Sequence, residues 1–277
     1  MAASGPSLLS WTAMYGKAAT GYPQRVVCLA AEHVETCFAL GVGDRVAGVP
    51  GTVRHPPEAR DLPHVGGFTT FRAERIMALA PDLVLAFSDL QADVTAELVR
   101  AGLPVLCTNP RSLDEVLASL LVVGGALGRA REAEALVLDM RDEIRQVREF
   151  SSVWPQRPRV YFEEWPDPPI AGIAWVSELI ELAGGRDVFA ELRDRRAAAG
   201  RIVDLDEVAR RDPEVILASW CGKPLDAAAI AARPGWAGVS AVRAGRIFEL
   251  PGADVLVPGP SLMRGLRSIH EIVQQVL

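Results

Sequence analysis

Two stretches of the chain, VETCFALGVGDRV at 34–46 and VSELIELAGGRDV at 176–188, follow the same pattern. In both, apolar residues recur at the spacing of a helix face and are followed by glycine, Gly43 aligning with Gly185. Glycine commonly ends a helix because it adopts the left-handed conformation without steric cost. The repeated order predicts that one helix-to-strand unit occurs twice in this chain.

The neighbouring residues extend this repeat. ERIMALAPDLVLA at 74–86 matches DEVARRDPEVILA at 206–218, with the two prolines in register. RVVCLA at 25–30 and RVYFEE at 159–164 are predicted to be the leading strands of the two halves. Strands that alternate with helices of this length are typical of parallel sheets covered by helices on both faces. We therefore predict an α/β fold with two Rossmann-like lobes.

The segment between the halves, 112–150, has an almost purely helical pattern. Its apolar stripe recurs every three or four residues and consists of Val137, Met140, Ile144 and Val147. This pattern predicts one long α-helix that joins the lobes, with domains at 25–128, 129–152 (linker helix) and 158–277. Ligands of parallel α/β sheets gather beyond the carboxyl ends of the strands, so we expect a ligand cleft between the lobes.

Composition excludes several classes of protein. The 277 residues carry a net charge of -6 without a basic cluster, which argues against a nucleic-acid partner. No apolar run is long enough to span a membrane. The first 22 residues show neither a secretory signal pattern nor a lipoprotein cysteine. We therefore expect a cytoplasmic protein as written, or a periplasmic or cell-surface protein if an export signal has been removed.

Several motifs resemble one known family. AEHVETCFALGVGDRVAGV, ERIMALAPDLVLAF, EEWPDPPIAGIAWVSELIELAGG and LVPGPSLMRGLRSIHEIV, in this order, are similar to segments of the substrate-binding proteins of ABC importers. The resemblance covers Arg25–Leu277 and points to the subgroup with a rigid helical backbone, which handles cobalamin, ferric siderophores and haem. The cobalamin-binding branch is the most similar.

The resemblance implies a function without covalent chemistry. We expect a corrinoid such as cobalamin to be bound between the lobes, as the bound ligand and not as an obligatory cofactor. The protein would be a component of an ABC-type uptake system or a signal-less relative of one. An ABC permease is the partner that the family implies, and we expect a monomer.

The same resemblance suggests site residues. A corrin ring needs flat apolar surfaces, which aromatic side chains supply. The expected ligand contacts are the aromatic residues Phe68, Trp165, Trp175 and Trp220 and the polar residues His33, His55, Glu164 and Asp254. Gly200 and Arg201 stand where some members carry another tryptophan. The family's permease-docking carboxylates match Glu74 and Asp206, with Glu207 as the adjacent alternative to Asp206.

Two alternatives remain open at this point. One is a ferric-siderophore or haem binder on the same fold, although the chain has only Tyr15, Tyr22 and Tyr161 as tyrosines. The other is a metal carrier or an enzyme that uses His33 with Glu163 or Glu164. Adjacent strand residues point to opposite faces, so the two glutamates should not converge on one atom. Because catalytic motifs and metal-ligand spacings are also absent, we expect no catalytic residues and no metal site.

Overall fold

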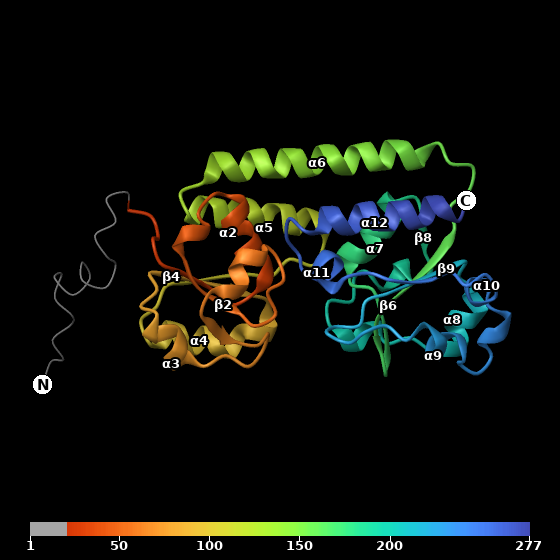
Figure 1. The fold of residues 1–277 in the computed structure, drawn as a ribbon, viewed down its shortest axis with the longest axis horizontal. Helices are drawn as coiled ribbons and strands as arrows, with labels where there is room; N and C mark the ends of the chain where they lie inside the picture. The colour runs from red at the N-terminus through yellow and green to blue at the C-terminus, as the bar shows by residue number, and fades with distance from the viewer. Residues whose placement is uncertain (1–20) are drawn as a thin grey trace, which may run out of the picture. The chain divides into compact units, whose positions relative to one another are not determined.

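The computed structural model describes residues 21–277, which form two compact units (Figure 1). Unit 1 contains the chain up to Pro110 together with Ala118–Val137, and unit 2 contains Arg111–Leu117 and Leu138–Leu277. The two-lobed α/β architecture predicted from the repeat is confirmed. The predicted boundaries at 25–128, 129–152 and 158–277 stay a prediction. Residues 1–20, which were searched for an export signal, lie outside the described residues.

Unit 1 is built on a parallel five-stranded sheet with the strand order β3-β2-β1-β4-β5. Helix α2 covers one face of this sheet and helices α3 and α4 cover the other (Figure 1). Its elements are β1 (Val26–Cys28), α2 (Ala31–Ala39), β2 (Val46–Pro50), β3 (His64–Gly66), α3 (Ala73–Ala78), β4 (Leu83–Phe87), α4 (Ala92–Arg100) and β5 (Val105–Thr108). Helices α5 (Leu113–Ala126) and α6 (Ala130–Ser152) follow.

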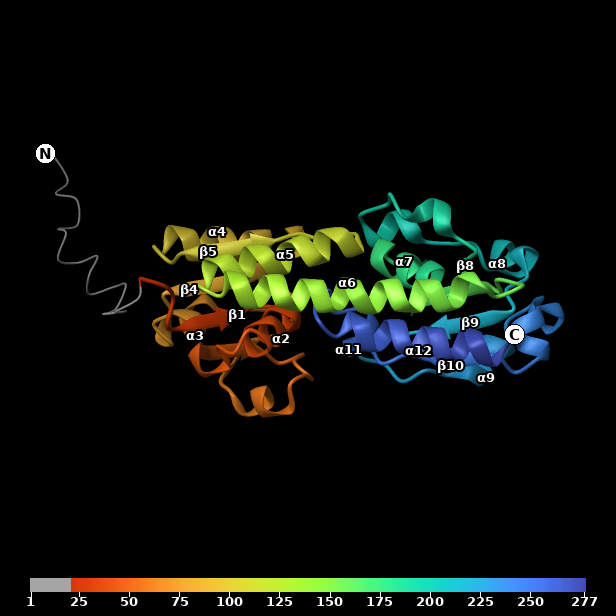
Figure 2. The ribbon, with the colours of Figure 1, turned by 90° about the horizontal axis from the view of Figure 1, so that it is seen from above.

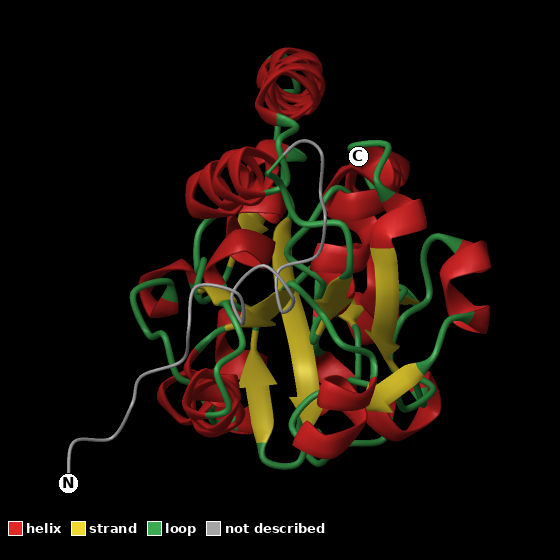
Figure 3. Cartoon of the chain, turned by 90° about the vertical axis from the view of Figure 1, so that its left-hand side faces the viewer, coloured by secondary structure: helices red, strands yellow, loops and turns green. Residues whose placement is uncertain are grey.

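The two central strands of unit 1 show why these residues form a parallel sheet. All three residues of β1 and all five of β4 are buried. A strand covered by helices on both faces must be apolar throughout, and the runs VVC and LVLAF meet this requirement. In Figure 3, which looks onto the unit 1 side, the strands form a layer with helices on either side.

Unit 2 repeats this scheme with a sheet in the order β10-β9-β6-β7, in which β8 also pairs with β6. Helices α7 and α12, which pack together, lie on one side of it and α8 and α9 on the other (Figure 1). Its elements are β6 (Arg159–Pro166), β7 (Pro169–Ala171), α7 (Ala174–Leu182), β8 (Arg186–Asp187), α8 (Leu205–Arg211), β9 (Val215–Ala218), α9 (Ala227–Ala231), α10 (Ser240–Arg243), β10 (Ile247–Glu249), α11 (Gly252–Val255) and α12 (Leu262–Gln275).

The strand registers confirm the internal repeat. In unit 1, Val26 of β1 pairs with Leu83 of β4. In unit 2, Val160 of β6 pairs with Val215 of β9. Leu83 and Val215 are the residues that the sequence alignment of 74–86 with 206–218 superimposes. The repeat is therefore a repeat of strand pairing, not only of composition.

Unit 2 departs from a purely parallel sheet at the proline-rich end of β6. The chain turns at Asp167 and returns as β7, which pairs antiparallel with β6, Trp165 opposite Ile170. Pro169 begins β7, a position where a missing N–H is tolerated because the strand lies at the edge of the sheet. β6 therefore extends beyond the predicted strand 159–164, and the hairpin places Trp165 on a strand.

The long helix α6 was predicted correctly; Val137, Met140 and Val147 of its apolar stripe are buried and Ile144 is partly exposed. Within unit 2 its second half lies beside α12 (Figure 2), where Glu143 forms an ion pair with Arg267. An open groove of about 550 Å³ runs between these two helices and is lined by residues such as Phe150 and His270. Across residues 21–277, no helix combines the length and the apolar character that crossing a membrane requires.

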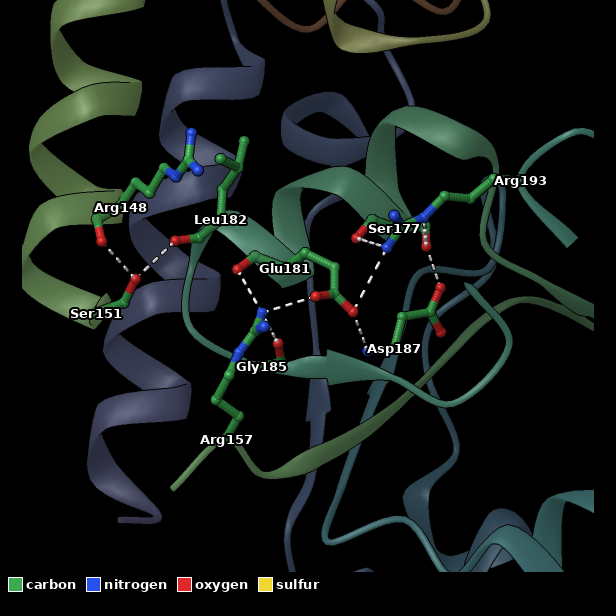
Figure 4. A network of polar contacts seen from close by, with 9 residues as sticks. All are labelled: Arg148, Ser151, Arg157, Ser177, Glu181, Leu182, Gly185, Asp187 and Arg193. Atoms are coloured by element: carbon green, nitrogen blue, oxygen red, sulfur yellow. Dashed lines mark hydrogen bonds and ion pairs between the residues drawn. The ribbon is translucent and has the colours of Figure 1, made fainter. Parts of the chain in front are cut away.

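A polar network joins the start of β6 to α7 and β8 (Figure 4). Arg157 donates to the Glu181 carboxylate at 2.7 Å and to the Gly185 carbonyl at 2.6 Å. The Ser177 hydroxyl contacts the Asp187 carboxylate and accepts from Arg193 at 2.7 Å. Burial raises the pKa of Asp187, and the Ser177 contact offsets part of that effect. The network lies where β6 begins, at the opposite end of the strand from Glu163. It therefore connects β6, α7 and β8 without contributing residues to the carboxyl ends of the strands.

Candidate functional site

Glu163 is the central polar group at the carboxyl end of the unit 2 sheet. Its side chain is completely buried near the end of β6. The carboxylate accepts two hydrogen bonds from Arg233, at 2.6 and 2.9 Å. It also accepts one from the Tyr161 hydroxyl at 3.1 Å and one from Trp220 Nε1 at 3.0 Å. A buried charge is tolerated when it is paired and hydrogen-bonded in this way, so Glu163 serves as an anchor for its neighbours.

Trp220 and Trp165 are connected through Lys223 in this part of unit 2. The indole of Trp220 is oriented by its hydrogen bond to Glu163, and the residue stands just after β9. A turn closed by the Lys223 N–H donating to the Trp220 carbonyl at 2.8 Å brings the Lys223 ammonium over the Trp165 ring, 4.2 Å from its centroid. Trp165 Nε1 donates to the Asp167 carbonyl. Both rings are partly exposed, so they can offer a face to a ligand.

The adjacent carboxylate, Glu164, has a different partner. It pairs with Arg201 at 2.6 Å, whereas Glu163 pairs with Arg233, so the two glutamates point to separate environments as strand geometry predicts. Arg201 is only 2% exposed, and it also donates to the Ala171 carbonyl. Arg201, at the place where the family resemblance suggested a further tryptophan, is therefore engaged in an ion pair.

Two of the residues expected to contact a ligand are engaged inside unit 2. Trp175 is 3% exposed, and its Nε1 donates to the Val255 carbonyl at 2.9 Å. The expected ligand contact at Trp175 stays a prediction; in this structure the side chain is buried and its indole N–H is engaged by the Val255 carbonyl. Asp254 forms an ion pair with Arg264 at 2.8 Å, with its side chain 14% exposed.

In unit 1, Phe68 is held by a residue that the sequence patterns did not single out. Gln91, which is 1% exposed, donates to the carbonyls of Leu29 and Phe68, each at 3.0 Å. Its side-chain oxygen accepts from the Phe87 N–H at 2.9 Å. The ring of Phe68 lies 6.2 Å from that of Phe87 and is partly exposed. Gln91 thus ties the Phe68 loop to the carboxyl ends of β1 and β4.

The histidines of unit 1 differ in their surroundings. His33 Nε2 lies 3.0 Å from the Thr108 hydroxyl at the end of β5, and the side chain is 2% exposed. Burial lowers the pKa of His33 to about 4, so the imidazole is neutral near pH 7. His55 precedes Pro56 in the loop after β2 and is partly exposed.

The two expected docking carboxylates occupy equivalent places in the two units. Glu74 lies in the first turn of α3 and Asp206 in the first turn of α8, and both are exposed. Glu207, the alternative, forms ion pairs with Arg210 and Arg211. Asp206 is therefore the more available carboxylate of the adjacent pair.

A metal site finds no support in the described part of the chain. Residues 21–277 contain no group of three or more His, Cys, Asp or Glu side chains placed to hold a metal ion. Glu163 is engaged by four hydrogen bonds and Glu164 by Arg201, and no observation favours the metal-carrier or enzyme alternative over a binding protein.

Comparisons with known proteins agree with this architecture. The sequence model described as "Periplasmic binding protein" matches residues 26–253. An uncharacterized ABC transporter substrate-binding lipoprotein of Bacillus subtilis is 27% identical over 91% of this chain and 80% of its own length. The vitamin B12-binding protein of Yersinia pestis is 26% identical over 73% of this chain and 72% of its own. The apo structure of a periplasmic heme-binding protein from a Roseiflexus species has a TM-score of 0.80 at 27% identity, covering 91% of this chain and 98% of that one.

Proposed function

The chain belongs to the periplasmic binding protein family, and from this premise we propose that it captures a corrinoid ligand for uptake. As a relative of ABC substrate-binding proteins it is the ligand-binding component of an ABC-type uptake system and works with a permease. Binding proteins of this kind act by capture and release, so no covalent step is assigned to any residue. The identity of the ligand is the part that we propose.

The observation that carries the proposal is the pair of tryptophans at the carboxyl strand ends of unit 2. Trp220 is oriented by the buried Glu163, and the turn that follows it places Lys223 over Trp165. A ring held in this way binds a flat ligand without losing further side-chain freedom, which favours affinity. Each aromatic side chain can bury about 150–250 Å². Phe68 of unit 1, fixed by Gln91, is proposed as a further apolar contact.

The chemistry of these residues favours a corrinoid over haem. Haem iron takes an axial ligand from the protein, commonly histidine or tyrosine. Tyr161 is completely buried and its hydroxyl donates to Glu163, so its phenol is not free to bind a haem iron. A corrinoid needs aromatic faces and hydrogen bonds to its amide groups. Haem remains the second candidate, because a heme-binding protein has the same fold at a TM-score of 0.80.

The permease contact is proposed at Glu74 and Asp206. Both carboxylates are exposed in the first turn of equivalent helices of the two units. This arrangement suits arginines on a permease surface, because charge complementarity across an interface steers docking. The expected cytoplasmic location has no support in the relatives, which include a lipoprotein and a periplasmic protein. We therefore propose that the protein acts outside the cytoplasm, as a monomer.

The test is a ligand titration of the purified protein. Cobalamin, cobinamide, haem and a ferric siderophore are added separately while visible absorbance and tryptophan fluorescence are followed. We expect both corrinoids to shift the absorbance and quench the fluorescence, and Trp165→Ala to lose at least tenfold in affinity. Trp154→Ala is the matched control, because Trp154 stacks on His270 before β6 begins. Signals that respond to haem or siderophore but not to corrinoids at tens of micromolar would refute the corrinoid assignment.

A further inference from the structure

Helix α2 begins with a buried carboxyl group and a buried imidazole whose hydrogen bonds are incomplete. Glu32 and His33 form its first turn, directly beyond the carboxyl end of β1, and are 6% and 2% exposed. Glu32 Oε1 and His33 Nδ1 have no hydrogen-bond partner within the described part of the chain. Leaving a buried polar atom unpaired costs about 1–3 kcal/mol, so two such atoms in one helical turn call for an explanation.

The surroundings keep both groups neutral. Burial raises the pKa of Glu32 to about 8, and the nearby carboxylate of Glu35 on the same helix adds to this effect. Cys28 on β1 also faces Glu32, and its thiol is protonated because burial raises its pKa well above 9.0. His33 is neutral as well, since burial lowers its pKa to about 4. At pH 7 Glu32 is therefore mostly a carboxylic acid, with one hydroxyl donor and one carbonyl acceptor.

A carboxylic acid of this kind complements a primary amide. Glu32 Oε1, the carboxyl oxygen without a partner in the described part of the chain, can carry the hydroxyl and donate to the amide carbonyl, or can accept from the amide N–H. An ionised carboxylate can only accept, and it would repel the carboxylates of haem. His33 Nδ1 is a second polar atom of the same helical turn without a partner among the described residues, while its Nε2 lies 3.0 Å from the Thr108 hydroxyl. The cluster also lies at the edge of the sheet where ligands of parallel α/β folds are bound.

We infer that Glu32, as a carboxylic acid supported by the His33 imidazole, recognises a primary amide of the ligand and selects amide-bearing corrinoids. This inference rests on the proposed function, since corrinoids carry primary amides around the ring. It deepens that function by naming the group that reads the ligand's periphery. Binding then satisfies the two atoms that the unliganded protein leaves unpaired.

The inference has a consequence for pH. Once Glu32 ionises it loses its hydroxyl donor, and only the protonated fraction of the protein binds the amide. One pH unit above the Glu32 pKa that fraction is about one-tenth, so the apparent affinity falls about tenfold. Gln at position 32 has both a donor and an acceptor and does not titrate, so it should bind an amide with no such pH dependence.

The experiment titrates cobinamide and cyanocobalamin into the wild-type protein, Glu32→Gln and Glu32→Leu between pH 6 and 9.5. We expect the wild-type affinity to fall about tenfold near pH 9, Glu32→Gln to bind at every pH, and Glu32→Leu to bind weakly throughout. Glu178→Gln is the matched control, because burial also raises the pKa of Glu178, which instead accepts from the Leu113 N–H at the start of α5.

The outcomes separate the two proposals. Corrinoid binding that is flat with pH in the wild-type protein, or that falls equally in Glu32→Gln, overturns the role of Glu32 and leaves the corrinoid function standing. Failure of every corrinoid to bind at any pH, in protein that unfolds cooperatively on heating, overturns both. A fall with pH that disappears in Glu178→Gln would place the titrating group elsewhere and would also reject the inference.

Discussion

Arg233 Nη1 lies 2.6 Å from Glu163 Oε2, and this ion pair is almost entirely removed from solvent, with the two side chains 12% and 0% exposed. The guanidinium also lies over the Trp236 ring, 4.8 Å from its centroid. Because Glu163 orients Trp220 as well, the same pair supports both the core of unit 2 and the proposed ligand surface. A substitution in the Glu163–Arg233 pair should therefore affect both the stability of unit 2 and the proposed ligand binding.

Replacing Arg233 with alanine should strongly destabilise unit 2. Removal of one partner leaves the other charge buried and uncompensated, which costs about 3–5 kcal/mol. Denaturant unfolding measures the loss. Arg210→Ala is the control, because the Arg210–Glu207 pair is exposed at its arginine and should contribute less than about 1 kcal/mol. If the two variants lose equal amounts of unfolding free energy, the buried Glu163–Arg233 pair stabilises the protein no more than an exposed ion pair does.

Replacing Gln91 with leucine should loosen the Phe68 loop. Leucine keeps the size of the side chain but leaves the Leu29 and Phe68 carbonyls and the Phe87 N–H without their partner. We expect a loss of about 2–4 kcal/mol in the free energy of unfolding and weaker ligand binding. Gln146→Leu, on the exposed face of α6, is the control and should change neither quantity. A stable Gln91→Leu protein with unchanged affinity would contradict the positioning role.

Stability should fall with pH between about 6.5 and 8 through Glu32. Its pKa is about 8 in the folded protein and near 4.5 when unfolded, so the folded state holds the extra proton and loses stability as the pH rises. His33 has the opposite effect, because its lowered pKa makes stability rise with pH, but only between about pH 4 and pH 6.5. A single group changes stability by about 1.4 kcal/mol per pH unit at most, which gives about 2 kcal/mol across this window. Thermal unfolding of the wild-type protein and Glu32→Gln should diverge accordingly, and parallel curves would exclude Glu32 as the source.

Reversing the charge of Glu74 or Asp206 should abolish transport and leave ligand binding intact. Both carboxylates are exposed, so Glu74→Arg and Asp206→Arg should fold normally and bind corrinoid with unchanged affinity. Uptake into vesicles that contain the permease is the measurement. Glu58→Arg, another exposed site in unit 1, is the charge-matched control. Normal uptake with both reversed variants would exclude docking through these residues.

Adding a methyl group at Gly265 should destabilise the packing of α12 against α11. A Cβ there would lie 2.3 Å from the Asp254 carbonyl oxygen and 2.8 Å from Val255 Cγ1, so the backbone must move. Overpacking of this kind costs about 1–3 kcal/mol. Gly125→Ala, in α5 with open space around it, should instead stabilise by about 0.5–1 kcal/mol because alanine is the better helix former. Calorimetry of the two variants should show melting temperatures shifted in opposite directions.

Several features of the fold could be predicted because they depend on local patterns. The match of 74–86 with 206–218 predicted equivalent strands, and the structure pairs Leu83 and Val215 with the leading strands in the same way. The stripe along α6 predicted its length and its buried face. The hairpin at Trp165 was missed, because a proline-rich stretch at a strand end is compatible with either a loop or an edge strand.

The proposed site could be predicted only in part. Strand alternation correctly predicted that Glu163 and Glu164 point to different environments. A carboxylate inside an apolar strand also implies a buried cation as its partner. The sequence offers many arginines for that role, and no pattern distinguishes Arg233 from the others. Gln91 gave no signal either, because its three partners are backbone atoms of distant segments. Trp175 is buried in unit 2, a property that its sequence position did not reveal, and its expected ligand contact stays a prediction.

The sequence by itself determined the repeated α/β order, the long helix and the buried strands, because side-chain periodicity follows from the local geometry of helices and strands. Tertiary structure alone decided which groups meet, such as Glu163 with Arg233 across 70 residues and Gln91 with Leu29 across 62. It also decided that Glu32 and His33 are buried and neutral. Burial and charge pairing depend on how distant segments close on one another in space, and no local pattern encodes that closure.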